Sequence, residues 1–429
     1  MSVQTGATAP AQASAPAEES IYWPFAIAWL LALVFYFIQY ALRSAPSVMI
    51  PDLTQAFGLT ALGLSSLLGL YYYPYAAFAI VAGASLDRYG AKLPMAAGVF
   101  AVAAGSVLFG LGSIGAAESG RLLQGAGSAF SFTGAVYLAS RGFSRHWLAT
   151  AVGFTQCFGM LGGFAGQFVV GPLVHGPIGW QAFWINSGVL CVILGVLVLI
   201  TTPATHDPAR GSVWSMFAPY KVVLTNPQSY LCGFVGGLLF MPTTVGIMIW
   251  GVPLLRALGA EPGEAVQRAS SVALGWVIGA PLLGYIADRI GRRKPVLFGG
   301  IVVMLLALYG VVYMPGVLPH YVAGLTFGIA SGAAMIPYSM IKEVNPDNVK
   351  GSATGAMNFL VFSLSAFVAP AFGLELSRLS GGQPMTLSVF QKADLIWVGA
   401  IVLAFILTLF LRETGVAGRS APPAPATVR

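Results

Sequence analysis

Twelve long apolar stretches dominate this sequence and limit what it can fold into. A membrane-spanning helix needs about 20 apolar residues, and stretches of that order occur at about 23–50, 61–84, 94–113, 117–140, 147–171, 178–202, 227–256, 266–287, 295–314, 319–341, 352–376 and 393–412. Only 8% of the 429 residues are charged, whereas about 25% is usual in soluble domains. The sequence therefore argues against a soluble enzyme and predicts an all-α membrane protein with twelve transmembrane helices.

The longest interruption divides six stretches from six and sets the predicted domain organisation. We expect two six-helix bundles, residues 21–202 and 226–413, joined by a cytoplasmic linker at 203–225. Residues 1–20 are rich in Ala, Pro, Ser and Thr and lack the basic start of a secretory signal. They are expected to be a disordered cytoplasmic tail, and residues 414–429 a second cytoplasmic tail.

The distribution of lysine and arginine predicts the orientation in the membrane. If both termini are cytoplasmic, fifteen of the 21 basic residues fall in inner loops or the C-terminal tail and four on the outer side. This is the bias of the positive-inside rule. The basic residues form short clusters between apolar stretches rather than one stripe, which argues against a nucleic-acid partner.

No cofactor or metal site is expected from the sequence motifs. Cys157, Cys191 and Cys232 all lie within apolar stretches, and none has a Cys-x-x-Cys partner, so disulfides and zinc are not expected. The sequence contains no Walker loop, Rossmann fingerprint or metal-spaced histidine cluster. Any transport would therefore be driven by a gradient rather than by ATP.

A loop that follows the second stretch is repeated after the eighth. Gly83, Asp87, Arg88 and Gly90 recur in the same order, each displaced by 201 residues, as Gly284, Asp288, Arg289 and Gly291. Two halves of six stretches each thus carry the same loop at the same place. Parallel repeats of this kind occur in transporters that bind their substrate near the midplane, between the halves.

The repeated loop resembles the Gly-x-x-x-Asp-Arg-x-Gly-x-Lys signature of the major facilitator superfamily. A second signature of that family is similar to the segment that opens the fourth stretch, Arg121-Leu-Leu-Gln-Gly-Ala-Gly-Ser128. The resemblance extends from Trp23 to Arg412. It implies the fold of that superfamily and a transporter, not an enzyme, that alternates between inward-open and outward-open states.

Other segments refine the resemblance. Arg43 to Leu53, followed by Tyr71 to Tyr75, resembles bacterial permeases for organic anions and small nutrients, which implies a bacterial inner membrane. The glycine-rich antiporter motif is met only loosely, by Gly159, Gly162, Gly163, Gly166, Gly171 and Pro172. That departure argues against a drug exporter.

Arg43 is the most informative candidate for substrate binding, because an ionisable group inside a span is costly and by default functional. Helical spacing places it on one face with Tyr36, Gln39, Tyr40 and Ser47. A guanidinium facing the cavity there could hold a carboxylate or phosphate through two parallel hydrogen bonds. The alternatives are that Arg43 extends to the outer interface, or that Asp52 or Glu375 neutralises it.

Neutral polar residues complete the candidate substrate site. We select Gln156, Tyr338, Asn358 and Trp250 to join Tyr36, Gln39, Tyr40 and Arg43. The alternative for each amide or hydroxyl is a hydrogen bond that holds two helices together. The alternative for Trp250 is a place in the interfacial belt or the core.

The signature residues are expected to control conformation rather than to touch substrate. An Asp near one helix end can meet the N-terminal dipole of a neighbouring helix, and breaking that contact would bias one side open. We assign this role to Gly83, Asp87, Arg88, Gly90, Gly284, Asp288, Arg289 and Gly291, with topology anchoring as the alternative. Arg121 is expected to act in packing or coupling and to pair with Glu118, with direct substrate contact as the alternative. Gly120, Gly125 and Gly127 are expected to allow close helix contacts.

The acidic residues point to the class of substrate. No stretch has Asp or Glu near its centre, whereas a proton relay usually needs such a group. Asp52 and Glu375, at outer helix ends, are the best titratable candidates for proton coupling. We therefore predict a secondary transporter of a small organic anion, working by exchange with a counter-anion or by ion-coupled symport, as a monomer in lipid. The alternative classes are a permease for amino acids, nucleosides or other neutral nutrients, and a non-transporting sensor.

Overall fold

The computed structural model describes residues 21–143, 145–204, 217–346 and 349–415, without the side chains of Asp87 and residues 145–150. The described residues form helices and connecting turns, with no strand among them. The all-α prediction is thus confirmed. Both predicted tails, except for residues 414 and 415, and most of the predicted linker lie outside the described residues.

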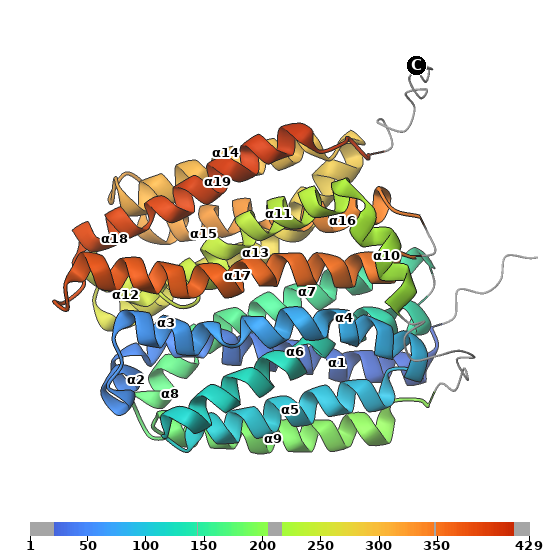
Figure 1. Ribbon diagram of the computed structural model, residues 1–429, viewed down its shortest axis with the longest axis horizontal. Helices are drawn as coiled ribbons and strands as arrows, with labels where there is room; N and C mark the ends of the chain where they lie inside the picture. Colours follow the sequence, from blue (N-terminus) through green and yellow to red (C-terminus); the bar gives the residue numbers. More distant parts are fainter. Residues whose placement is uncertain (1–20, 144, 205–216, 347–348, 416–429) are drawn as a thin grey trace, which may run out of the picture.

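The helices of the first half are long and separated by short turns (Figure 1). They are α1 (Trp23–Ser44), η1 (Ala45–Val48), α2 (Ile50–Phe57), α3 (Ala61–Gly69), α4 (Tyr72–Tyr89), α5 (Lys92–Gly110), α6 (Ile114–Gly142), α7 (Arg145–Phe168), α8 (Val170–Val174) and α9 (Trp180–Thr201).

The second half begins after the linker, with α10 (Ala218–Thr225). It continues with α11 (Pro227–Met241), the π-helical turn η3 (Pro242–Ile247), α12 (Gly251–Ala257), α13 (Pro262–Ile290), α14 (Lys294–Val312), α15 (His320–Ser331), η4 (Gly332–Met335), α16 (Ile336–Glu343), α17 (Lys350–Ser380), α18 (Leu387–Ala393) and α19 (Leu395–Phe410).

Eleven helical segments of the described chain are long and apolar enough to cross a membrane. Each corresponds to one of the predicted stretches. The remaining stretch, 117–140, is covered by α6, which has 29 residues and is therefore long enough to span. Its many small and polar residues, with Glu118, Arg121 and Arg141, lower its hydropathy. Its role as a twelfth span stays a prediction.

Helices of the same half pack closely where glycines face one another. A Cβ atom added to Gly105 of α5 would lie 2.5 Å from the carbonyl oxygen of Gly120 on α6, and one added to Gly98 would lie 2.8 Å from that of Gly127. Gly125 faces the backbone of Tyr71 in the same way. These contacts agree with the close packing expected for Gly120, Gly125 and Gly127.

The two halves of the chain lie on opposite sides of a central contact zone. In Figure 1, α1 to α6, α8 and α9 lie below, and α11 to α19 lie above. Across the zone α7 packs on α13, while α17 packs on both α3 and α4. Polar side chains on these helices are therefore the ones that can meet between the halves.

Candidate functional site

A small chamber lies between the two halves and is lined by five of the eight residues predicted for substrate binding. Its lining includes Tyr36, Tyr40, Gln156, Tyr338 and Asn358, together with aromatic rings and Met335. Its volume is about 10 Å³, which leaves room for about one water molecule. The sequence thus identified the chamber, which is nearly closed in this conformation.

Hydrogen bonds fix the polar groups of the chamber within each half. The Tyr36 hydroxyl donates to Oε1 of Gln156 at 3.2 Å. The Tyr338 hydroxyl donates to Oδ1 of Asn358 at 2.8 Å. The first pair joins α1 to α7 and the second joins α16 to α17. Because neither pair crosses between the halves, the chamber could widen without breaking them.

Arg43 lies next to the chamber but is not among its lining residues. Its Nη2 donates to Oε1 of Gln39 at 3.2 Å and to the Tyr71 hydroxyl at 2.9 Å. The same Tyr71 hydroxyl donates to Oε1 of Gln39 at 2.8 Å. Nε and Nη1 of Arg43 are buried without a hydrogen-bond partner. Two of its donor groups are therefore available to an acceptor.

Aromatic rings surround the Arg43 guanidinium. Ring centroids lie 4.4 Å from its Cζ for Tyr40, 4.9 Å for Tyr71, 5.0 Å for Tyr75 and Phe362, and 5.9 Å for Tyr72. Each such ring can attract a cation through its electron-rich face. Tyr40, Tyr75 and Phe362 also line the chamber, so they form the wall between it and Arg43. The prediction that Arg43 faces the cavity directly is thus corrected.

Arg43 neither reaches the outer interface nor pairs with Asp52 or Glu375. Its side chain is 1% exposed, so it does not extend to the interface. Asp52 lies 3.4 Å from His175, and Glu375 lies 3.9 Å from Arg378. No carboxylate among the described residues pairs with Arg43, and both alternatives raised for it are therefore wrong.

A second buried guanidinium, that of Arg121, also lies beside the Tyr71 ring. Arg121 donates to Oε1 of Gln124 at 2.8 Å and to the carbonyl oxygen of Leu68 at 3.1 Å. Its Cζ lies 4.9 Å from the centroid of the Tyr71 ring. The predicted pair with Glu118 is wrong, because Arg121 points inward while Glu118 is exposed. The Tyr71 ring thus lies 4.9 Å from each of two cations, and neither pairs with an acid in the described structure.

Trp250 does not line the chamber and instead closes one end of the contact zone. Its Nε1 donates to the Ser65 hydroxyl at 3.0 Å, which joins α3 to the residue before α12. Two more hydrogen bonds link the first half to η3. The Tyr72 hydroxyl donates to the Thr244 carbonyl oxygen at 3.1 Å, and Nε2 of Gln167 donates to the Ile247 carbonyl oxygen at 3.2 Å. We call these three bonds the cross-half seal.

A larger cavity opens on the opposite side of the chamber, at the end predicted to be cytoplasmic. Its volume is about 710 Å³. We call it the vestibule. It shares Phe132, Gln156, Met335 and Tyr338 with the chamber, so the two cavities adjoin. The signature residues Gly83 and Gly284 line it as well. The vestibule thus adjoins the chamber at this end, while residues of η1, α8, α12 and α13 line a further cavity of about 870 Å³ at the other end.

The second signature loop forms an ionic network at the same end. Arg293 lies 2.5 Å from Asp288 and 2.8 Å from Glu343. Partial burial opposes its charge, but hydrogen bonds to both carboxylates outweigh burial and raise the pKa of Arg293. Among the described residues, Arg289 bonds to Tyr285 alone, at 3.0 Å. The signature pattern predicted a role for Asp288 and Arg289, whereas Arg293, which bonds to both carboxylates, was not predicted.

The carboxylate of Glu413 caps the start of α14. It accepts the backbone N–H of Arg293 at 2.6 Å and that of Lys294 at 3.1 Å. Partial burial raises the pKa of Glu413, but these N–H groups, with those of Gly415 and Thr414, outweigh it and hold the pKa below its usual value. An acidic group thus meets a helix N-terminus, as predicted for the signature loop, but the group is Glu413 rather than Asp288.

The repeated positions of the two loops differ in what can be described. Gly90 and Gly291 end α4 and α13 with φ of 72° and 70°, a conformation that favours glycine. A Cβ atom on Gly83 would lie 2.7 Å from the Tyr220 hydroxyl. The Arg88 guanidinium lies 5.5 Å from the Tyr89 ring, and the Asp87 side chain lies outside the described structure. The latch role of these residues stays a prediction.

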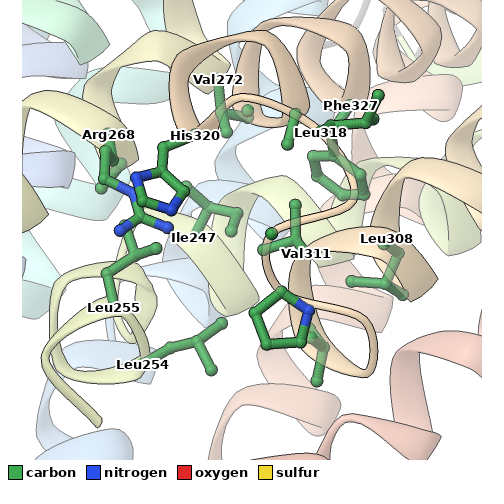
Figure 2. Close-up of a pocket in the computed structure, with 17 residues that line it drawn as sticks. Ile247, Leu254, Leu255, Arg268, Val272, Leu308, Val311, Leu318, His320 and Phe327 are labelled. Carbon is green, nitrogen blue, oxygen red and sulfur yellow. The ribbon is translucent and has the colours of Figure 1, made fainter. Parts of the chain in front are cut away.

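Another cavity lies within the second half, away from the chamber (Figure 2). It is mostly apolar, and Arg268 and His320 lie at one side of it. Glu264 joins these two, at 3.5 Å from Arg268 and 3.3 Å from His320. Arg268, unlike Arg43, therefore has a carboxylate partner.

Comparison with known proteins agrees with this arrangement. The family model described as Major Facilitator Superfamily matches residues 32–370 and 244–425. The 4-hydroxybenzoate transporter PcaK of Pseudomonas aeruginosa is 26% identical over 62% of this chain and 66% of its own length. The probable galactarate/D-glucarate transporter GudP of Escherichia coli is 23% identical over 89% of this chain and 92% of its own.

A solved structure shows the same fold at low identity. A bacterial homolog of the human lysosomal transporter Spinster, in an inward-facing and occupied conformation, superimposes with a TM-score of 0.72 at 16% identity. The match covers 93% of this chain and 99% of that one.

Proposed function

This chain belongs to the major facilitator superfamily and is a multi-pass secondary transporter rather than an enzyme; we propose that its cargo is a small organic anion. Arg43 carries the proposal, because it is a buried cation between the halves without a carboxylate partner in the described structure.

The free energy of the site favours an anionic ligand. Burying an ion costs several kcal/mol even after the protein relaxes around it. Hydrogen bonds to Gln39 and Tyr71 and the surrounding rings offset part of this cost, but Nε and Nη1 stay unpaired. A carboxylate that displaced the ring wall could accept a charge-assisted hydrogen bond from Nε or from Nη1. Arg121, which lies beside the same Tyr71 ring, would add further attraction.

The lining of the chamber indicates what the rest of the ligand looks like. Tyr36, Tyr40, Gln156, Tyr338 and Asn358 supply hydroxyls and amides, while Phe132, Phe240 and Phe362 supply rings. An organic acid with an aromatic or hydroxylated body fits that mixture. The names of two relatives, which specify 4-hydroxybenzoate and galactarate or D-glucarate, support the same class. No acidic residue lines the described chamber to meet the ammonium group of an amino acid.

We further propose the architecture predicted from the sequence, with α6 as the twelfth span. The bundles would be residues 21–202 and 226–413, with the linker and both termini in the cytoplasm. Rocking of one bundle against the other would break the cross-half seal and close the vestibule. Exchange against a second anion, or symport with an ion, would drive the cycle, and a monomer suffices.

Thermal stabilisation of the purified protein tests the anion site, since a ligand that binds the folded state raises the melting temperature. The panel contains 4-hydroxybenzoate, D-glucarate, neutral sugars, amino acids and nucleosides. We expect a carboxylate to raise the melting temperature of the wild type, to raise that of Arg43→Lys weakly, and to leave that of Arg43→Gln unchanged. The matched control is Arg268→Gln, which removes a buried arginine away from the chamber and should keep the response. Stabilisation only by amino acids or nucleosides, or an unchanged response in Arg43→Gln, would overturn the proposal.

A further inference from the structure

The vestibule has a positive lining. Of the described residues that line it, Arg293, Lys342 and Lys350 are basic and none is acidic. A cavity with walls of one charge sign concentrates ions of the opposite sign. The vestibule is therefore suited to gathering anions before they reach the chamber.

Lys342 is a vestibule cation without a hydrogen-bond or ion-pair partner among the described residues. Arg293 is engaged by both Asp288 and Glu343, whereas the Lys342 ammonium forms no hydrogen bond or ion pair in the described structure. The carboxylate of its neighbour Glu343 is already used by Arg293 and by the Thr414 hydroxyl, which donates to it at 2.6 Å. An ammonium group has three donors and no acceptor, so an anion would be its natural partner.

The position of Lys342 on α16 connects it to the chamber. Tyr338 and Lys342 are four residues apart and so lie on one face of the helix. Both line the vestibule, as does Ser339 between them, and Tyr338 also lines the chamber. An anion at Lys342 would thus be about one helical turn from the Tyr338–Asn358 pair.

The volumes decide where an anion can be held in this conformation. The chamber has room for about one water molecule, at about 10 Å³, so an organic acid does not fit in it. The vestibule, at about 710 Å³, is large enough. An anion entering from this end must therefore stay in the vestibule until the chamber widens.

We propose that Lys342, with the Ser339 hydroxyl, forms a separate vestibule site that binds the carboxylate of the cargo before it reaches Arg43. The proposal rests on the proposed function, because it takes the same cargo. It adds a difference between the two sides of the membrane. Lys342 binds anions that enter through the vestibule, whereas Arg43 binds anions from both sides.

Side-specific transport tests this asymmetry. Membrane vesicles of the two orientations would be used to measure the KM for 4-hydroxybenzoate and D-glucarate from each side. Lys342→Gln should raise the KM from the vestibule side about tenfold or more and change the KM from the other side less than twofold. Lys342→Arg should restore most of the affinity. Lys221→Gln removes an exposed lysine of α10 that does not line the vestibule, and it should match the wild type.

Salt provides a second readout, because it screens attraction between exposed charges. Raising the ionic strength should increase the vestibule-side KM of the wild type more than that of Lys342→Gln. Equal salt dependence would overturn the vestibule site even if one variant transported poorly for another reason.

The outcomes separate this inference from the proposed function. If Arg43→Gln abolishes carboxylate binding while Lys342→Gln leaves both KM values unchanged, the vestibule site is wrong and the proposed function stands. If Arg43→Gln has no effect, the proposed function is wrong. If the wild type transports neither acid, the melting temperature is measured with a series of small carboxylates instead. An equal rise in melting temperature for the wild type and Lys342→Gln would overturn the vestibule site.

Discussion

Trp250→Phe should shift this protein away from the sealed conformation. The substitution keeps an aromatic ring in a buried position but removes the Nε1 donor that bonds to Ser65 across the two halves at 3.0 Å. That bond can exist only while α3 and the start of α12 are together. Its loss should therefore destabilise the sealed state relative to the state in which the halves have separated at this end.

The expected magnitude follows from the number and kind of bonds in the cross-half seal. A neutral hydrogen bond contributes about 0.5–1.5 kcal/mol net, which corresponds to a change of about 2- to 13-fold in an equilibrium constant. Trp250→Phe removes one of the three bonds and leaves those of Tyr72 and Gln167 in place. The seal should weaken by that factor without being lost.

Trp276→Phe is the matched control. Trp276 is buried like Trp250, and its Nε1 donates to the Thr243 hydroxyl at a similar distance of 3.0 Å. Both Trp276 and Thr243 belong to the second half, so this bond does not depend on how the halves are placed. Trp276→Phe should lower the melting temperature about as much as Trp250→Phe but leave the conformational equilibrium unchanged.

The assay is a distance measurement between spin labels at Gln55→Cys and Gln383→Cys, in a background without the native cysteines. Both positions are exposed, one in α2 and one between α17 and α18. Trp250→Phe should enlarge the fraction of longer distances, and Trp276→Phe should not. An equal effect of the two variants, or none, would refute the reasoning that Trp250 acts as a seal between the halves.

Three further predictions concern affinity, packing and pH. Tyr71→Phe removes the hydroxyl that bonds to Arg43 and Gln39, so the carboxylate affinity measured by titration should change at least threefold. An unchanged affinity would show that the Tyr71 hydroxyl takes no part in carboxylate binding. Gly105→Ala should lower the free energy of unfolding by about 1–3 kcal/mol through overpacking, while Gly115→Ala, which has open space, should not; thermal denaturation compares them. Because hydrogen bonds lower the folded-state pKa of Glu413, its stabilising contribution is present above the unfolded pKa of about 4.3 and is lost as pH falls through the folded value; Glu413→Gln should remove that part of the acid dependence in a melting-temperature series.

Much of the fold was predictable because lipid leaves few choices. Long apolar stretches must become helices there, since each backbone polar group needs a partner within its own segment. The displacement of 201 residues between Asp87 and Asp288 added the internal repeat, and the repeat indicated the family. The exception was α6, where glycines and polar residues that serve close packing weaken the apolar signal.

The sequence alone also indicated which polar residues to expect inside the spans, but not how they are arranged. Helical spacing and the lack of acids near the centres of the apolar stretches identified Arg43, Tyr36, Tyr40, Gln156, Tyr338 and Asn358, because a polar group in a span is costly and few are present.

Only the tertiary structure decided which groups meet across helices. It placed Arg43 behind a ring wall that includes Phe362 from the distant α17, and it moved Trp250 from the substrate site to the seal. It also left Lys342 facing the vestibule while Glu343, its neighbour in the chain, was engaged by Arg293. Spacing along one helix reports a shared face, whereas a pairing between residues hundreds of positions apart depends on how the helices pack.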